Sequence, residues 1–144
     1  SILEGNAKVL GTLLDKSKYD PNRIIFTNDY AEIPALHQAA YSGNKEIVEL
    51  LLKRGGTKYI NEVAKGNISG DGDNALIFTL RGLSRDKNPP TADTLEIIRM
   101  LHSAGGDINF RNKKYYNLKA VSTRLEGPFA ALITKYLIEN GVKN

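Results

Sequence analysis

A leucine-rich segment closed by glycine recurs along the 144 residues, and this repetition constrains the fold more than any other feature of the sequence. Copies of it lie at 47–55, 95–105 and 132–141, with a shorter one at 9–14. A single unit of this size cannot bury its own apolar face, so repeated units stack and share a continuous core. The sequence therefore predicts a row of stacked units.

In each unit, another helical pattern precedes the leucine-rich one. In the clearest unit, Leu36, Ala39 and Ala40 lie at i, i+3 and i+4, which gives a short helix one apolar stripe. Gly43-Asn44 interrupts the pattern before the second helix begins. Gly55 ends that helix, because glycine adopts the left-handed conformation that satisfies the last carbonyls without steric cost. Each unit is therefore predicted to be a pair of helices.

The spacing between units places an insertion in the third one. Leu36 and Leu76 are 40 residues apart, whereas Gly55 and Gly105 are 50 apart, so about ten extra residues fall between the two helices of that unit. We predict one domain, 1–144, with units at about 1–22 (partial), 29–61, 73–109 and 115–144. The inserted stretch, 81–90, is locally basic, and both a neutral surface loop and a partner contact are consistent with it.

The second unit resembles the ankyrin repeat family. The matching residues are LHQAA at 36–40, Gly43-Asn44, the leucine-rich 47–52, Gly55 and Asn61. The resemblance implies an all-α fold, a helix-pair solenoid with projecting loops, and recognition of other proteins through the concave face and loop tips. Within it, His37 is expected to bridge backbone groups rather than to act chemically.

Several positions depart from the family pattern. Pro34 and Ala35 stand where the family has threonine and proline. Ile77 and Lys119 stand where the third and fourth units would carry histidine. The hydrogen bonds by which such histidines tie neighbouring turns together are then missing, so we expect looser stacking in the C-terminal half.

Composition excludes several classes of function. The chain has no Cys and two His, which removes disulfides, thiolate metal sites and cysteine nucleophiles. No apolar run is long enough to span a membrane. The Gly/Asp-rich stretch 65–74 lacks the closing Glu of a calcium loop and predicts a turn. We therefore predict no enzyme activity, no catalytic residue, no metal and no cofactor.

Charge is concentrated at the C-terminal end. The net charge is +4, and residues 110–144 hold seven Lys/Arg against Glu126 and Glu139. This excess predicts an acidic protein partner. Nucleic-acid binding is disfavoured, because the stretch lacks a dense basic stripe and stacking aromatics.

The predicted function is a protein-binding module, acting as an adaptor or scaffold. The predicted contact residues are Gln38, Tyr41, Arg81, Arg111, Lys113, Lys114 and Tyr115. Asn109 is a candidate for hydroxylation, because Leu101, Asp107 and Ile108 precede it at the spacing that the family's asparaginyl hydroxylase uses. The alternative is a targeting or substrate-recruiting domain of a larger enzyme or secreted bacterial effector. The expected location is the cytoplasm or nucleus, or the host cytosol for an effector.

Overall fold

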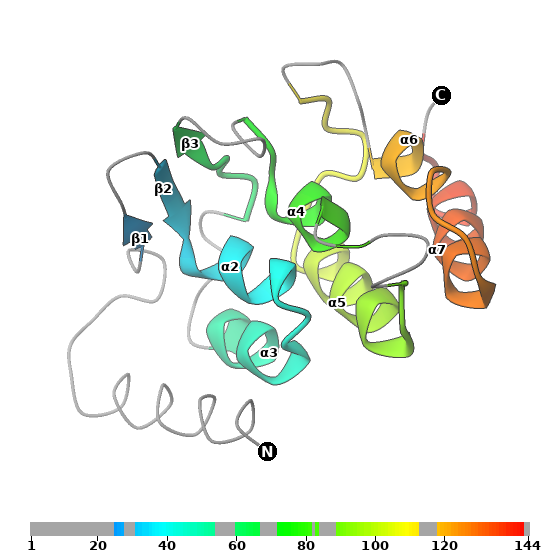
Figure 1. Ribbon diagram of the computed structural model, residues 1–144, viewed down its shortest axis with the longest axis horizontal. Helices are drawn as coiled ribbons and strands as arrows, with labels where there is room; N and C mark the ends of the chain where they lie inside the picture. Colours follow the sequence, from blue (N-terminus) through cyan, green and yellow to red (C-terminus); the bar gives the residue numbers. More distant parts are fainter. Residues whose placement is uncertain are drawn as a thin grey trace.

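The computed structural model shows a stack of helix pairs (Figure 1). It describes residues 25–27, 31–53, 60–66, 72–81, 83, 89–112 and 118–142, with the backbone alone for 25–27 and 31–34. The predicted partial unit at 1–22 lies outside the described residues.

The described helices form two layers. They are α2 (Ala35–Tyr41), α3 (Lys45–Lys53), α4 (Ala75–Arg81), α5 (Ala92–Ser103), α6 (Leu118–Ser122) and α7 (Pro128–Glu139). The first helices of the pairs, α2, α4 and α6, pack side by side, and the second helices, α3, α5 and α7, pack in a parallel row behind them. The helix-pair repeat predicted from the sequence is confirmed.

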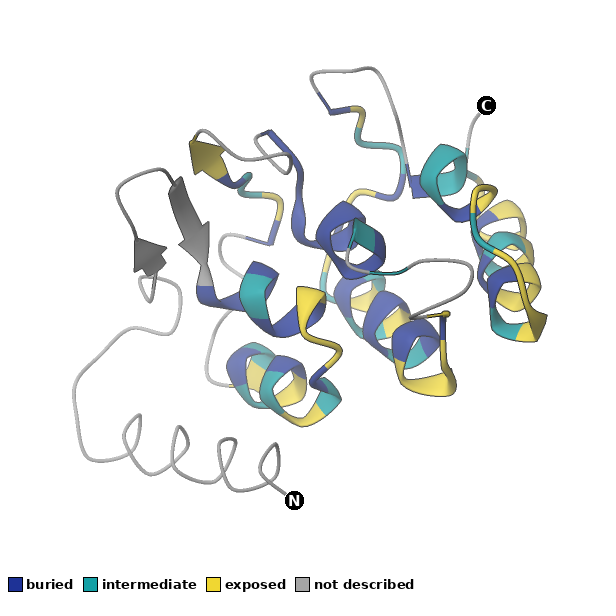
Figure 2. Cartoon of the chain, in the orientation of Figure 1, coloured by how far each residue is buried: buried dark blue, intermediate teal, exposed yellow. Residues whose placement is uncertain are grey.

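The core lies between the two layers and continues from one pair to the next (Figure 2). Its fully buried aliphatic side chains are Val48, Leu51, Leu76, Ile77, Leu80, Ile97, Ile98, Leu101, Leu118, Ile133 and Leu137. The predicted stripe of α2 is also buried, and Ala39 and Ala40 are small enough to let α2 and α4 approach closely. A shared core of this kind makes each pair depend on its neighbours for stability.

Local sequence signals set the helix ends. Thr91 caps α5 with a capping box: its hydroxyl accepts from the Thr94 amide, and the Thr94 hydroxyl accepts from the Thr91 amide. After α5, Gly105 has φ of +104°, and the Gly106 amide donates to the Leu101 carbonyl at 2.9 Å. Gly105 closes α5, as the glycine that ends the 95–105 segment predicts.

A small sheet accompanies the helices. Strands β1 (Ile25–Thr27), β2 (Ala31–Pro34) and β3 (Lys65–Gly66) pair antiparallel in that order. Phe26 lies opposite Ile33, and Glu32 opposite Lys65. The sheet thus joins the segment before α2 to the loop that follows α3, and it lies beside α2 (Figure 1).

The insertion lies where the spacing predicts it. Residues 42–44 connect α2 to α3, whereas 82–91 connect α4 to α5, and α5 is longer than α3. None of the helices in the described part of the chain has the length and apolar character needed to cross a membrane.

Candidate protein-interaction surface

The candidate surface is the row of first helices, and Tyr41 is its most exposed aromatic residue among those described. Tyr41 ends α2 with 46% of its surface accessible. Its ring centroid lies 6.1 Å from that of Phe78 on α4, with the planes tilted by 59°. Phe78 is itself buried, and the edge of the His37 ring packs against it at 5.2 Å. Tyr41 is therefore an exposed ring that rests on a fixed base.

Arg81 occupies the corresponding end of the neighbouring helix. The 40-residue repeat spacing matches Tyr41 with Arg81, and α2 packs directly on α4. The Nε group of Arg81 donates to a carboxylate oxygen of Asp73, whose side chain is fully buried, while the Arg81 side chain stays 26% exposed. Arg81 is thus held from inside the chain, and part of its positive charge faces outward.

Asp73 is the residue on which three segments converge. One carboxylate oxygen accepts from Arg81, and the other accepts from the Nδ2 group of Asn112 at 2.9 Å. The backbone carbonyl of Asp73 accepts from Nε2 of His37 at 3.2 Å. A carboxylate with no exposed surface requires such partners, because an unpaired buried charge is strongly unfavourable. The sequence analysis placed Asp73 in a turn and did not identify this role.

His37 links two neighbouring helix pairs through its side chain. It is 1% exposed, and burial lowers its pKa to about 4, although the hydrogen bond to the Asp73 carbonyl partly opposes this shift. The imidazole is therefore neutral at neutral pH and donates one hydrogen bond across the gap between two helix pairs. The bridging role expected for His37 is confirmed.

The asparagines that close the units form a second set of ties. Asn61 Nδ2 donates to the Gly105 carbonyl at 3.1 Å, and Asn61 Oδ1 accepts from the Asp107 amide at 2.8 Å. Asn109 Nδ2 makes the corresponding contact with the Gly141 carbonyl, at 3.5 Å. The candidate hydroxylation residue is therefore a half-buried link to the next unit, and its modification stays a prediction.

The junction between the third and fourth units is held by groups other than the family's histidine. The Ile77 side chain has no hydrogen-bond donor, and the hydrogen bond across this junction runs from Asn112 to Asp73. On the outer layer, His102 Nδ1 forms a 2.8 Å hydrogen bond with the Tyr136 hydroxyl, and the Arg99 guanidinium lies 5.7 Å from the Tyr136 ring centroid. These groups hold the junction in place of the histidine that Ile77 replaces, and His102 is half-buried between α5 and α7.

Two of the remaining predicted contact residues, Gln38 and Arg111, lie within the described part of the chain. Gln38 is half-buried on α2, one turn before Tyr41. Arg111 is exposed, and its neighbour Asn112 fastens that stretch of chain to Asp73. The other three, Lys113, Lys114 and Tyr115, lie outside the described residues. The structure therefore brings Gln38, Tyr41 and Arg81 onto adjacent helices.

Acidic and histidine side chains do not gather into a reactive or metal-binding group in the part of the chain described. Groups of three or more potential ligands are absent from those residues. Glu46 and Glu49 are both exposed on α3. Asp73, the acid of the proposed turn, is instead taken up by internal partners.

Comparison with known families identifies the repeat. Residues 33–65 match the family model named Ankyrin repeat, a span that runs from within β2 through α2 and α3 to the first residue of β3. No curated protein matches the chain significantly. Ankyrin repeats are in general protein–protein interaction modules. Together with the two-layered stack of helix pairs, this match shows that the chain contains an ankyrin repeat at residues 33–65.

Proposed function

We propose that this ankyrin repeat protein binds a partner protein through the face formed by α2, α4 and α6 and by the loop that carries Arg111. The observation that carries the proposal is the placement of Tyr41: exposed, aromatic, and supported from below by Phe78. Tyr is enriched among the residues that dominate binding energy, because it combines a large apolar area with a polar group.

The support beneath Tyr41 favours binding energetically. A side chain that is already held in place loses less conformational freedom when a partner covers it. The ring contact with Phe78 and the packing of α2 on α4 provide that preorganisation. Tyr41 is thus suited to act as the central apolar anchor of the surface.

Positive charge on the helix next to this anchor favours an acidic partner. Arg81 is held by Asp73 with part of its side chain exposed, and Arg111 is exposed near Asn112. In the sequence, residues 110–144 add seven Lys/Arg against Glu126 and Glu139. Charges of this kind accelerate encounter with an oppositely charged surface more than they increase affinity.

A crosslinking experiment tests the anchor directly. A photoreactive phenylalanine analogue is placed at position 41 in the full chain, and, as a matched control, at Leu132, which is 44% exposed on the second-helix row. We expect one partner protein to crosslink at position 41 and not at 132. Crosslinking of that partner at 132 and not at 41 would place the binding surface on the opposite layer.

Affinity measurements with the captured partner complete the test. Tyr41→Ala is expected to weaken binding at least about tenfold, because a central aromatic anchor contributes about 2 kcal/mol or more. Leu132→Ala is expected to leave the affinity unchanged. Equal affinities for the wild type and Tyr41→Ala would overturn the proposal.

A further inference from the structure

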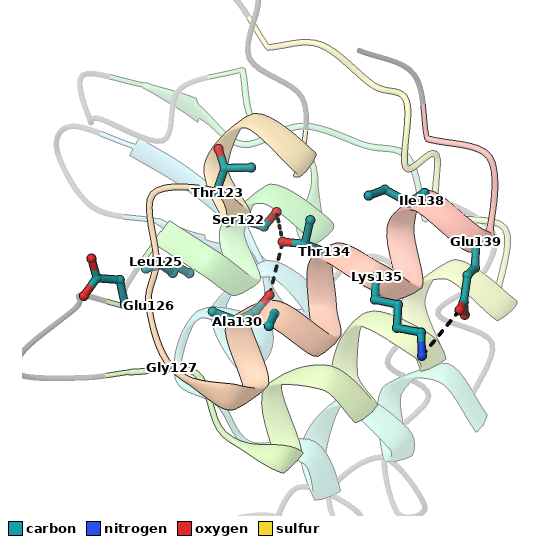
Figure 3. A pocket seen from close by; sticks show the side chains of 11 residues that line it. Ser122, Thr123, Leu125, Glu126, Gly127, Ala130, Thr134, Lys135, Ile138 and Glu139 are labelled. Carbon is teal, nitrogen blue, oxygen red and sulfur yellow. Dashed lines mark hydrogen bonds and ion pairs between the residues drawn. The ribbon is translucent and has the colours of Figure 1, made fainter.

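The face of the α6–α7 pair that points away from α5 holds a broad cavity. It has a volume of about 670 Å³ and is lined by eleven residues from α6, the connecting loop and α7. Its floor is formed by small side chains, where the Ser122 and Thr134 hydroxyls lie 3.1 Å apart (Figure 3). On its rim, Ile138 is 56% exposed, the highest value among the exposed large hydrophobic side chains of the described residues.

Aligning α7 with α5 shows which positions on this face correspond to helix–helix contacts one pair earlier. Aligning Gly105 with Gly141 matches Arg99 of α5 with Lys135 of α7, and His102 with Ile138. Arg99 and His102 are the α5 residues that contact Tyr136 of α7. Lys135 and Ile138 therefore occupy positions that, one pair earlier, dock against the next helix. No helix among the described residues covers them.

This face carries one positive and one negative side chain, so it is electrostatically complementary to the same face of a second copy. Lys135 and Glu139 are one turn apart on α7 and flank Ile138. Their side chains are 69% and 61% exposed, and the 3.8 Å ion pair that they form within the helix is loose enough to exchange partners. Two antiparallel copies of α7 related by a two-fold axis level with Leu137 would bring Lys135 of each copy to Glu139 of the other, with each Ile138 one residue from the axis.

We propose that the α6–α7 face binds a second copy of this chain through such a two-fold axis. The two Ile138 side chains meet at the centre, and two Lys135–Glu139 pairs flank them. A second copy fits this face because one helix carries both the apolar residue and the two opposite charges that the pairing requires. Eleven lining residues are about half the number on each side of a standard interface, so the dimer is weak and forms at high protein concentration.

Sedimentation equilibrium of the full chain across a wide concentration range tests the proposal. The wild type is expected to show a monomer–dimer equilibrium. Ile138→Asp abolishes it, whereas the matched control Leu132→Asp, at an exposed aliphatic residue of the same helix that does not line the cavity, preserves it. Circular dichroism of both variants verifies that they are folded. A wild type that stays monomeric at every concentration overturns the proposal, as does an Ile138→Asp variant that dimerises normally.

Charge reversal tests the two-fold geometry. Lys135→Glu and Glu139→Lys are each expected to weaken self-association at least about tenfold, because each places like charges opposite one another. Mixing the two variants in equal amounts restores the dimer, since every acidic pair then faces a basic one. Failure of the mixture to associate excludes the antiparallel pairing. Capture of a foreign helix by this face in place of a second copy also contradicts it.

Discussion

The two junctions of the stack have the same architecture and different chemistry. At the first junction, between α2–α3 and α4–α5, His37 donates to the Asp73 carbonyl, as the ankyrin pattern implies. At the second junction, between α4–α5 and α6–α7, the corresponding position is Ile77, and the tie comes from Asn112 to the Asp73 side chain. Asp73 therefore serves both junctions, one through its backbone and the other through its carboxylate.

This difference shows that stacking requires a hydrogen bond at each junction but does not fix which residue donates it. The two layers must approach closely at each junction to bury their aliphatic faces, and any buried donor there must find an acceptor. Imidazole meets this need at the first junction, and an amide side chain on the opposite segment meets it at the second. The candidate surface depends on the second contact, because Arg81 is bonded to Asp73 and Arg111 precedes Asn112 in the sequence.

The largest predicted effect is that of Asp73→Ala. This change removes the acceptor of Asn112 and leaves the Arg81 guanidinium without its counter-charge, so we expect a loss of roughly 3 kcal/mol in the free energy of unfolding. Urea unfolding measures it. The control is Asp93→Ala, which removes a 3.4 Å ion pair with Lys45 whose carboxylate is 53% exposed and should cost less than about 1 kcal/mol. Equal losses of unfolding free energy for the two variants would contradict the proposed role of Asp73 in holding both junctions.

Acidification is predicted to weaken the first junction selectively. The His37 pKa is about 4 in the folded protein against 6.5 for the free side chain, so the unfolded chain binds a proton over this interval and the folded chain does not. Stability therefore falls as the pH drops from 6.5 to 4, by roughly 3 kcal/mol in all. A His37→Gln variant is less stable at neutral pH and lacks this loss of stability between pH 6.5 and 4. The same pH dependence in both proteins would exclude His37 as its source.

A smaller effect is expected at the outer layer of the second junction. Tyr136→Phe removes the hydroxyl that pairs with His102 and preserves the ring beside Arg99, so we expect a loss of about 1 kcal/mol. Thermal or urea unfolding measures it. A variant as stable as the wild type would mean that packing alone holds α5 to α7.

The smallest predicted effect is kinetic and concerns the loop that follows Asn112. Reversing Lys113 and Lys114 to Glu is expected to slow association with an acidic partner about threefold at low salt, with less change in the dissociation rate. Stopped-flow or surface binding kinetics at two salt concentrations gives both rates. Association that is equally fast for variant and wild type at low salt contradicts a role for these lysines.

Local signals predict the repeat well. Glycine spacing and the apolar stripe of α2 depend on residues close in sequence, and both are found as expected. The role of His37 follows from its motif. The bonds of Asn112 and His102 could not be predicted, because their partners are 39 and 34 residues away and no spacing rule relates them. The pairing of β2 with β3 depends on the path of a loop for the same reason.

The most direct test of the account is amide hydrogen exchange in an Asn112→Ala variant, compared segment by segment with the wild type. If the Asn112–Asp73 hydrogen bond replaces the missing histidine tie, amides of α6 and α7 should exchange faster while those of α2 and α3 keep their protection. Unchanged protection in α6 and α7, or an equal loss across all helices, would contradict a specific role for this bond in holding the second junction.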